Sequence, residues 1–357
     1  MVRKYRIGII GLGAMGVRYL KVLHASPRWD IVWVCDLNPE RLAWARDFVP
    51  RVITGDDADD LIRRLEVDAL GIFTLADMRP YFVRSALQRN IHVIAEKPLA
   101  ATIEEEEQLL DTIEASDCFV TVNLFNRNAW YHHQIQEFIR DGQIGQLAIL
   151  SISHQTPGLM PTVGHTPEGP PFHDCGMHYV DLARWYAGSE YDRWDAQGLR
   201  MWGWKDPWWV NAHGSFKNGI VFNITQGFTY GQLAQTEVIH SGIEAIGTLG
   251  VVRMEHDFHE VVIQYHGVSR TETRKGPYGG KKLSVLCQKM ADSIAAGRNM
   301  GLPTARDSVI ASKISQAMLD FAREHAAPVV GTPQEMDQIL QHKQTLPNIE
   351  ARVSEGE

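Results

Sequence analysis

The sequence is short of the features that mark secreted, membrane-spanning and nucleic-acid-binding proteins. Its 357 residues include four cysteines, none in a C-x-x-C pair. We therefore expect neither a disulfide framework nor a structural zinc site, but a reducing compartment and a cytoplasmic protein. No apolar run is long enough to span a bilayer. The net charge is -8, which disfavours nucleic acid or an anionic membrane as the main partner but leaves open a local basic pocket.

What is present is a globular composition, with 44% hydrophobic and 22% charged residues. The length predicts two domains, and no internal repeat, low-complexity tract or flexible linker interrupts the chain. The first residues, MVRKYRIGIIGLGAMG, place basic residues before an apolar run, as a signal peptide does. Glycines break that run early, so we interpret it as a first strand and not as a targeting segment.

Residues 1–125 alternate short β-branched runs with amphipathic segments. This alternation predicts right-handed crossovers and an α/β domain built on a doubly wound parallel sheet. Pro39 fits a first helical position, and Thr102 with Glu105 makes a capping box. We expect the acidic run 104–107 to be a solvated helix face. The expected strands are 6–10, 31–35, 69–73, 92–95 and 119–124, and the expected helices are 14–25, 39–48, 58–65, 79–89 and 102–116.

The pattern changes near residue 125, so we assign 126–357 to a second, substrate-binding and oligomerisation domain. Strands 210–216 and 220–228 flank Asn218-Gly219, a strong two-residue hairpin signal. These features predict an α+β domain with an open-faced, mostly antiparallel sheet. A helix at 307–325, in a segment of about 305–325, is expected to pack near the first domain. The other expected elements are helices 130–141 and 175–187, strands 147–154, 237–246, 250–254 and 260–265, and a Pro/Gly-rich loop at 157–171.

A glycine motif, Gly11-Leu12-Gly13-Ala14-Met15-Gly16, directly follows the first strand and opens the first helix. In that context it indicates dinucleotide binding. Gly11 permits a tight turn, Gly13 lets the backbone approach a pyrophosphate, and Gly16 lets the helix pack close to the sheet. The start of the helix, at Ala14 and Met15, has unpaired amides and a positive dipole that favour binding of a negatively charged phosphate. The alternative is that the glycines merely shape a turn.

Asp36 ends the second strand, about twenty residues past the glycines. There a carboxylate accepts hydrogen bonds from an adenosine ribose and repels a 2′-phosphate. Leu37 supplies no positive charge to hold such a phosphate, so NAD is favoured over NADP. Arg41, one turn into the next helix, softens that preference. The plainer alternative is that Asp36 only caps a helix.

The tripeptide Glu96-Lys97-Pro98 after the strand 92–95 resembles the glucose–fructose oxidoreductase, inositol dehydrogenase and rhizopine-catabolism (Gfo/Idh/MocA) family. Its other matches lie in order along most of the chain. The resemblance implies a Rossmann domain followed by an open-sheet domain, with NAD(P) in the crevice between them. It also implies a homodimer or homotetramer formed through the open sheet, and sugars, inositols or sugar acids as substrates. The matches are Thr74, Asn126-Arg127, Ile144-Gly145, the block 173–181 and Ile246-Gly247-Thr248.

The resemblance and the chemistry agree on Lys97, Asp174 and His178 as catalytic residues. Alcohol oxidation needs a base for the hydroxyl proton while the carbon gives a hydride to nicotinamide. If the stretch after Asp174 is helical, Asp174 and His178 sit one turn apart on one face. His178 is then the base, and Asp174 binds a substrate hydroxyl or stabilises the protonated ring. Lys97 holds the reacting oxygen and lies near the cofactor.

Some positions depart from the family pattern or keep two interpretations. Arg79 stands where relatives have histidine, so it could meet a phosphate or the nicotinamide side; with Thr74 it counts as a cofactor candidate. Glu96 either orients the cofactor or is a buried structural acid, and Asp181 is expected to be structural. The loop 168–173 is stiffer and bulkier than in relatives, which leaves the substrate class open.

Four further residues are candidates for substrate binding: Arg127, His154, His165 and His173. Arg127 could hold an anionic group or simply pair with an acid. The histidines could converge with His178, but their spacing matches no zinc signature, so no metal is expected. The tryptophans between 202 and 209 are expected in a core or subunit interface more often than against a sugar.

The leading hypothesis is an NAD-dependent oxidoreductase acting on a hydroxyl-bearing carbon of a sugar, glycoside, sugar acid or polyol. A second enzyme hypothesis keeps its NAD and cleaves a glycoside by transient oxidation and elimination. A third is a non-catalytic protein that senses NAD or sugar. The presence of Lys97, Asp174 and His178 favours catalysis over sensing.

Overall fold

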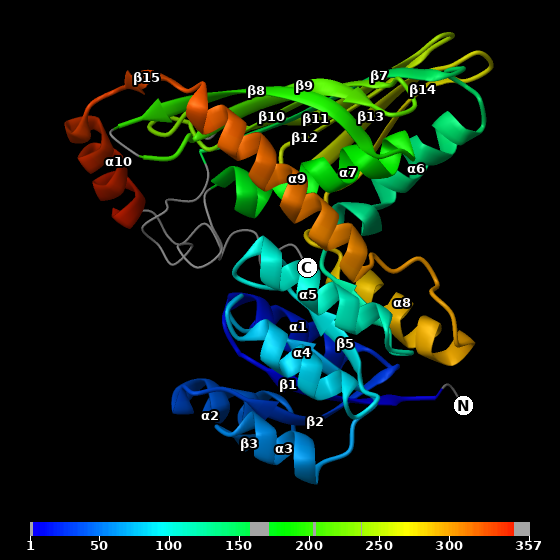
Figure 1. Ribbon diagram of the computed structural model, residues 1–357, viewed down its shortest axis with the longest axis vertical. Helices are drawn as coiled ribbons and strands as arrows, with labels where there is room; N and C mark the ends of the chain where they lie inside the picture. The colour runs from blue at the N-terminus through cyan, green and yellow to red at the C-terminus, as the bar shows by residue number, and fades with distance from the viewer. Residues whose placement is uncertain (1–2, 158–170, 203–204, 237, 346–357) are drawn as a thin grey trace. The chain divides into compact units, whose positions relative to one another are not determined.

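The computed structural model describes residues 3–157, 171–202, 205–236 and 238–345 (Figure 1). The chain forms two compact units. The first comprises Met1–Phe125 and Lys282–Ile310, and the second Asn126–Lys281 and Ala311–Glu357. No helix in the described ranges combines the length and apolarity that crossing a membrane requires.

The first unit contains a six-stranded sheet of order β3-β2-β1-β4-β5-β6, in which every neighbouring pair is parallel. The order reverses between β1 and β4, so the sheet is doubly wound, as predicted. Its strands are β1 (Tyr5–Ile10), β2 (Trp29–Cys35), β3 (Ile53–Gly55), β4 (Ala69–Ile72), β5 (His92–Ala95) and β6 (Val120–Val122).

Helices pack on both faces of this sheet, each face with its own apolar core. The first core joins one sheet face to α1 (Ala14–Ala25), α2 (Pro39–Phe48) and α8 (Leu283–Ala296). The second joins the other to α3 (Ala58–Arg64), α4 (Arg79–Leu87) and α5 (Ile103–Glu114). The bounds of α1 and α2 are confirmed as predicted.

Helix starts follow the capping residues found in the sequence. Asn38 accepts hydrogen bonds from the amides of Glu40 and Arg41 ahead of Pro39. Thr102 Oγ1 accepts from the amide of Glu105 at 3.2 Å. These caps fix the starts of α2 and α5.

One acidic side chain of α5 is not solvated as expected. Glu106 is only 1% exposed, so the interpretation of 104–107 as a solvated face is wrong for this residue. Glu106 shares the buried face of α5 with Leu109 and Ile113, three and seven positions further on. The helical period therefore buries Glu106 while leaving Glu104 and Glu107 exposed.

The segment Lys282–Ile310 corrects the expected domain boundary. The sequence interpretation placed all of 126–357 in the second domain, whereas this segment packs in the first unit. It buries Leu283, Leu286 and Met290 of α8 in the first core. The division then falls within α9 (Ala305–Glu324): Ala305 belongs to a first-unit core and later residues belong to the second unit.

The second unit is built on a nine-stranded sheet of order β14-β13-β12-β11-β7-β10-β9-β8-β15. All pairs are antiparallel except β7–β10 and β8–β15. The hairpin around Gly219, whose φ is +86°, is confirmed. The strands are β7 (Leu147–Gln155), β8 (Tyr191–Met201), β9 (Trp209–Phe216), β10 (Val221–Gly227), β11 (His240–Gly247), β12 (Val251–His256), β13 (Glu260–His266), β14 (Thr271–Pro277) and β15 (Ala327–Val330).

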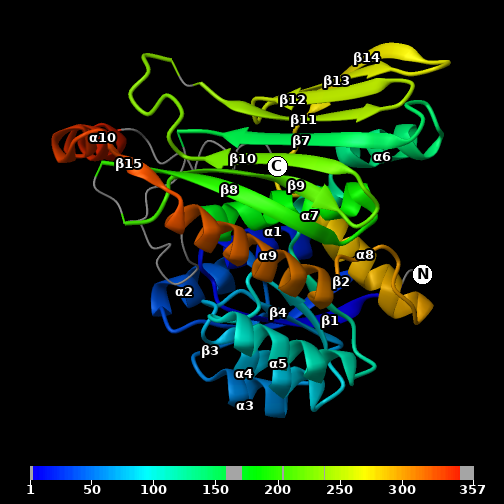
Figure 2. The same cartoon turned by 45° about the horizontal axis from the view of Figure 1, so that its top comes forward.

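Helices cover one face of this sheet. α6 (Trp130–Arg140), α7 (Met177–Ala187) and the second-unit part of α9 lie on that face (Figures 1 and 2). Strand β7 alternates accordingly, burying Leu150 and Ile152 beneath the helices and turning Ile149 outward. No helix among the described residues covers the outward face, so the sheet is open on one side, as predicted. The last helix is α10 (Pro333–Thr345).

The sequence interpretation missed or shortened several elements. It gave no helix at α8 and α10 and no strand at β3, β8, β14 and β15. Most of the expected loop 157–171, and Glu237 at the start of the expected strand 237–246, lie outside the described residues.

Candidate functional site

Three glycines shape the turn that follows β1. Gly11 has a φ of +90°, and a Cβ there would meet the carbonyl oxygen of Phe73 at 2.8 Å. A Cβ on Gly16 would come within 2.0 Å of the oxygen of Gly11, so this helix needs glycine for its own packing. A Cβ on Gly13 would meet nothing within 4 Å. No neighbouring atom of the protein therefore requires a glycine at position 13. The open space there fits the close approach of a pyrophosphate.

Asp36 secures the same turn from the end of β2. One carboxylate oxygen accepts from the amide of Leu12 at 2.6 Å, and the other accepts from the amide of Asn38 at 2.8 Å. Arg41 lies 3.7 Å from this carboxylate. Each carboxylate oxygen has a second acceptor position, so these bonds leave acceptor capacity for a ribose hydroxyl.

Apolar side chains stand exposed near the carboxyl ends of β2 and β4. Leu37 is 86% exposed and Leu75 52% exposed. Thr74 bonds locally, its hydroxyl donating to the carbonyl of Leu75 at 3.2 Å. Exposed leucines at the ligand-binding edge of a doubly wound sheet fit an apolar base such as adenine.

The carboxyl ends of β5 and β6 place Glu96 beside Asn123. Asn123 Nδ2 donates to Glu96 Oε1 at 2.9 Å, and both side chains are buried. Within the described part of the chain, the buried Oδ1 atom of Asn123 has no hydrogen-bond partner. The sequence interpretation missed Asn123, because it placed this residue inside the expected strand 119–124, whereas β6 ends at Val122.

Lys97 follows Glu96 in a buried turn whose Lys97–Pro98 bond is cis. Arg79, only 2% exposed, donates from Nη1 to the carbonyl oxygen of Pro98 at 2.6 Å. A guanidinium so buried, and bound to a backbone carbonyl, is placed to hold the turn. The cofactor role of Arg79 stays a prediction.

In the second unit, Asp174 and His178 lie on consecutive helical turns. A single π-helical turn, Phe172–Gly176, leads directly into α7. The predicted helix over 175–187 is thus confirmed, with its first turn widened. Both side chains are buried. π-helical turns are frequent at functional sites because the wider turn redirects side chains.

Arg127 pairs with an acid, the second of its two expected interpretations. Its Nε and Nη2 atoms donate to the two carboxylate oxygens of Asp181 at 2.7 and 2.6 Å. Asp181 is 1% exposed, which agrees with its expected structural role. The neighbouring Asn126 donates to the carbonyl of His178 at 3.4 Å. This pair and the Asn126 bond tie the 3-10 turn Phe125–Asn128 to α7.

His154 belongs to a buried polar chain on the covered side of the sheet. Its Nδ1 lies 2.9 Å from Ser241 Oγ, which lies 2.9 Å from His256 Nε2. Burial lowers the pKa of His154 to about 3 and that of His256 to about 4. Burial likewise holds the pKa of His132 well below its usual value. These imidazoles are therefore neutral at pH 7.

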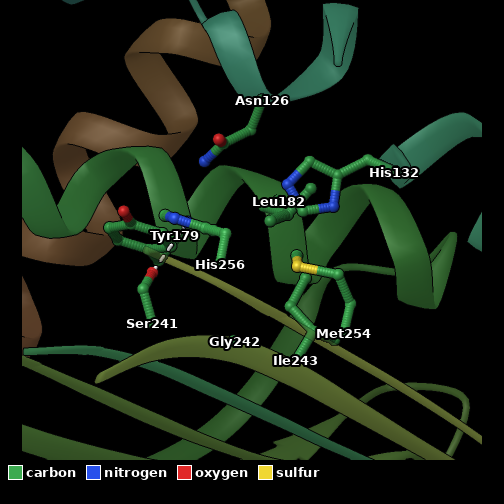
Figure 3. A pocket seen from close by; sticks show the side chains of 9 residues that line it. All are labelled: Asn126, His132, Tyr179, Leu182, Ser241, Gly242, Ile243, Met254 and His256. Carbon is green, nitrogen blue, oxygen red and sulfur yellow. Dashed lines mark hydrogen bonds between the residues drawn. The ribbon is translucent and has the colours of Figure 1, made fainter. Parts of the chain in front are cut away.

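Two members of this polar chain, Ser241 and His256, line a small cavity of about 10 Å³ (Figure 3). This volume has room for about one water molecule and none for a sugar. Ser241 and His256 were not found from the sequence, because only strand pairing brings them to His154. The lining residues are Asn126, His132, Tyr179, Leu182, Ser241, Gly242, Ile243, Met254 and His256.

The remaining candidates have separate surroundings. His173 Nε2 lies 3.1 Å from Ser312 Oγ, while His165 and Trp204 lie outside the described residues. Trp202 and Trp208 are buried in a small core with Met336 and Ile339, as expected of structural tryptophans. Among the described residues, no three histidine, cysteine or acidic side chains are gathered as a metal site would require.

Two family models match the chain, and together they span both units. An oxidoreductase family with an NAD-binding Rossmann fold matches residues 5–124, and the GFO/IDH/MocA C-terminal domain matches residues 132–253. The chain belongs to the GFO/IDH/MocA family. The predicted family is thus confirmed by its two domain models in their expected order.

Individual members of the GFO/IDH/MocA family are distant in sequence but close in fold. The rhizopine catabolism protein MocA of Rhizobium meliloti is 27% identical over 188 residues, 52% of this chain and 58% of that protein. The aligned stretch thus spans little more than half of that relative. The myo-inositol 2-dehydrogenase of Lactobacillus plantarum superposes with a TM-score of 0.77 at 20% identity, covering 91% of this chain and 98% of the other.

A second solved structure contains a cofactor. It is an oxidoreductase from Agrobacterium radiobacter in complex with NAD+, L-tartaric acid and magnesium. It superposes with a TM-score of 0.78 at 18% identity, covering 89% of this chain and 96% of the other. At these identities the likeness establishes the shared fold.

Proposed function

We propose that this protein is an NAD-dependent oxidoreductase that moves a hydride between nicotinamide and a hydroxyl-bearing carbon of a polyol or sugar. The single observation that carries the proposal is the glycine turn, with its open approach at Gly13 and its anchoring by Asp36. Membership in the GFO/IDH/MocA family supports the same activity.

The first unit would hold the cofactor. The turn Gly11–Gly16 would receive the pyrophosphate at the start of α1, where the helix dipole favours negative charge. Asp36 would accept from the ribose hydroxyls, and Leu37 with Leu75 would border the adenine. Because a carboxylate repels a 2′-phosphate, NAD is preferred over NADP, with Arg41 moderating the difference.

Lys97, Asp174 and His178 would act on one substrate hydroxyl. Bound nicotinamide supplies the hydride acceptor or donor. During oxidation His178 takes the hydroxyl proton, and Asp174 stabilises the imidazolium that results. The ammonium of Lys97 hydrogen-bonds the reacting oxygen and favours its negative charge. In the reverse direction His178 returns the proton to the oxygen.

Inositols and related polyols are the substrate class that the comparisons favour, since a solved neighbour is a myo-inositol 2-dehydrogenase. The ion pair of Arg127 with Asp181 fits a neutral substrate, because two donor atoms of this guanidinium already bind a protein carboxylate.

The test is turnover of a polyol panel with NAD, followed by absorbance of NADH. We expect reduction of NAD with at least one inositol or sugar. In Lys97→Met and His178→Asn, turnover should fall by about 100-fold or more while NAD affinity stays within twofold. NAD binding without turnover of any panel member in either direction would refute the activity. Release of a glycoside aglycone without NADH would instead indicate redox-neutral cleavage.

A second copy of this chain would cover the open sheet face. Ile149 of β7 and Val221 of β10 are paired in register and both exposed on the outward face. An apolar pair at the middle of an uncovered sheet fits a symmetric subunit interface. Light scattering should give a dimer or tetramer, and Ile149→Lys should shift it toward the monomer.

A further inference from the structure

The peptide group that follows the Lys97–Pro98 turn is held on both edges by buried charged side chains. Arg79 Nη1 donates to the oxygen of Pro98 at 2.6 Å. On the opposite edge, the amide of Leu99 donates to Glu106 Oε1 at 2.8 Å. The Pro98 carbonyl and the Leu99 amide belong to the same planar peptide group. A cation and an anion therefore fix the orientation of one peptide plane.

We propose that Arg79 and Glu106 are positioning residues that set the place and direction of the Lys97 ammonium. The proposal rests on the proposed function, in which Lys97 contacts the reacting oxygen. Few rotations separate the held plane from Lys97. The proline ring fixes φ of Pro98, and a residue that precedes proline is itself restricted. Fixing the plane after Pro98 therefore limits where the backbone can carry Lys97.

The two side chains come from rigid and neighbouring supports. Arg79 is the first residue of α4, and Glu106 lies in the first turns of α5, where a carboxylate is favoured by the helix dipole. The two helices pack against each other. Hydrogen bonds to charged groups are stronger than neutral ones, and burial excludes competing water. The hydrogen bonds of Arg79 and Glu106 to this peptide group therefore form a clamp that resists rotation of the peptide plane.

Such a clamp matters because catalytic groups must be held within about 0.5 Å of their productive positions. A displacement of about 1 Å can lower a rate by about 100-fold. Loss of the clamp should therefore reduce turnover and change the surroundings of Lys97. It should leave the glycine turn, and hence NAD affinity, intact, because that turn is fixed separately by Asp36.

The experiment uses the full chain with NAD and myo-inositol, and compares Arg79→Met and Glu106→Ala with the unsubstituted protein. We expect kcat to fall by about 100-fold while the dissociation constant of NAD stays within twofold. Amide exchange at Leu99 should accelerate by at least about tenfold. The rate of Lys97 acetylation by an acyl succinimide, read by mass spectrometry, should change by at least about threefold, with a shifted pH profile.

Matched controls lie on the same helices. Arg84→Met on α4 and Glu105→Gln on α5 should leave kcat, Leu99 exchange and Lys97 acetylation unchanged, because neither side chain touches the turn. Glu106→Gln should restore most of the activity lost in Glu106→Ala, since its amide oxygen still accepts from Leu99. Arg79→Lys should not restore it, because the shorter lysine side chain would not carry its ammonium to the position of Arg79 Nη1.

The proposal would be overturned if both Arg79→Met and Glu106→Ala kept the kcat and the Lys97 acetylation rate of the unsubstituted protein. If those two variants fail to fold, Arg79→Lys and Glu106→Gln decide. Slow turnover in Arg79→Lys together with near-normal turnover in Glu106→Gln supports the clamp. Equal turnover in the two variants overturns it. If the unsubstituted protein turns over no polyol, the proposed function fails. Leu99 exchange and Lys97 acetylation then still decide the clamp.

Discussion

His154 should make the second unit sensitive to acid, because the fold holds its ring neutral. Burial lowers its pKa from 6.5 to about 3, whereas the ring in the unfolded chain takes a proton near pH 6.5. The unfolded state therefore binds one more proton between these values, and the free energy of unfolding falls as pH drops through this window. Above pH 6.5 the penalty vanishes.

The magnitude follows from the proton difference. One buried neutral histidine changes the free energy of unfolding by about 1.4 kcal/mol per pH unit. At pH 5 this amounts to about 2 kcal/mol. That figure depends mainly on the unfolded pKa, since the native ring is still neutral at pH 5.

The assay compares His154→Asn with the unsubstituted protein between pH 6 and 4.5. Hydrogen exchange at β7 amides in increasing urea reports the second unit by itself. The slope of unfolding free energy against pH should fall by about 1.4 kcal/mol per pH unit in the variant, whatever its stability at pH 7. His213→Asn, which removes an exposed ring on β9, should keep the original slope. An unchanged slope in His154→Asn would refute the reasoning.

Four further single substitutions test the site and the cores. Gly16→Ala should lower the thermal midpoint of the first unit, because its Cβ would lie 2.0 Å from a backbone oxygen; Gly13→Val should keep that midpoint but weaken NAD binding, measured by calorimetry, by at least about tenfold. Arg127→Met should cost about 3–5 kcal/mol in urea unfolding by removing the bidentate cationic partner of the buried Asp181 carboxylate, and adding Asp181→Asn should recover part of the loss. Trp208→Ala should cost about 3–5 kcal/mol in the same measurement by opening a cavity in its small core.

Features that depend on neighbours in the chain were predictable. The bounds of α1 and α2 followed from the glycine turn, Pro39 and the spacing of apolar residues. The hairpin at Gly219 followed from its turn residues, and the parallel sheet followed from alternating periods. The family followed from a few motifs in order. In each case the deciding preference lies within a few residues, where backbone sterics and capping act.

Features that depend on distant partners were decided by the tertiary structure. Glu106 was expected in solvent, but packing of α5 turned it toward the peptide after Pro98. Arg79 was a cofactor candidate, and the tertiary structure brings its guanidinium to the same turn. Arg127 kept two interpretations until α7 brought Asp181 to it.

The same reason explains the domain boundary. The sequence by itself determined that the chain carries a dinucleotide-type domain, a second open-sheet domain and the residues of the family motifs. Only the tertiary structure decided that α8 completes the first unit and that His154 meets Ser241 and His256. Chain order carries little information about such contacts, because burial and hydrogen bonding select partners across long separations once the elements have formed.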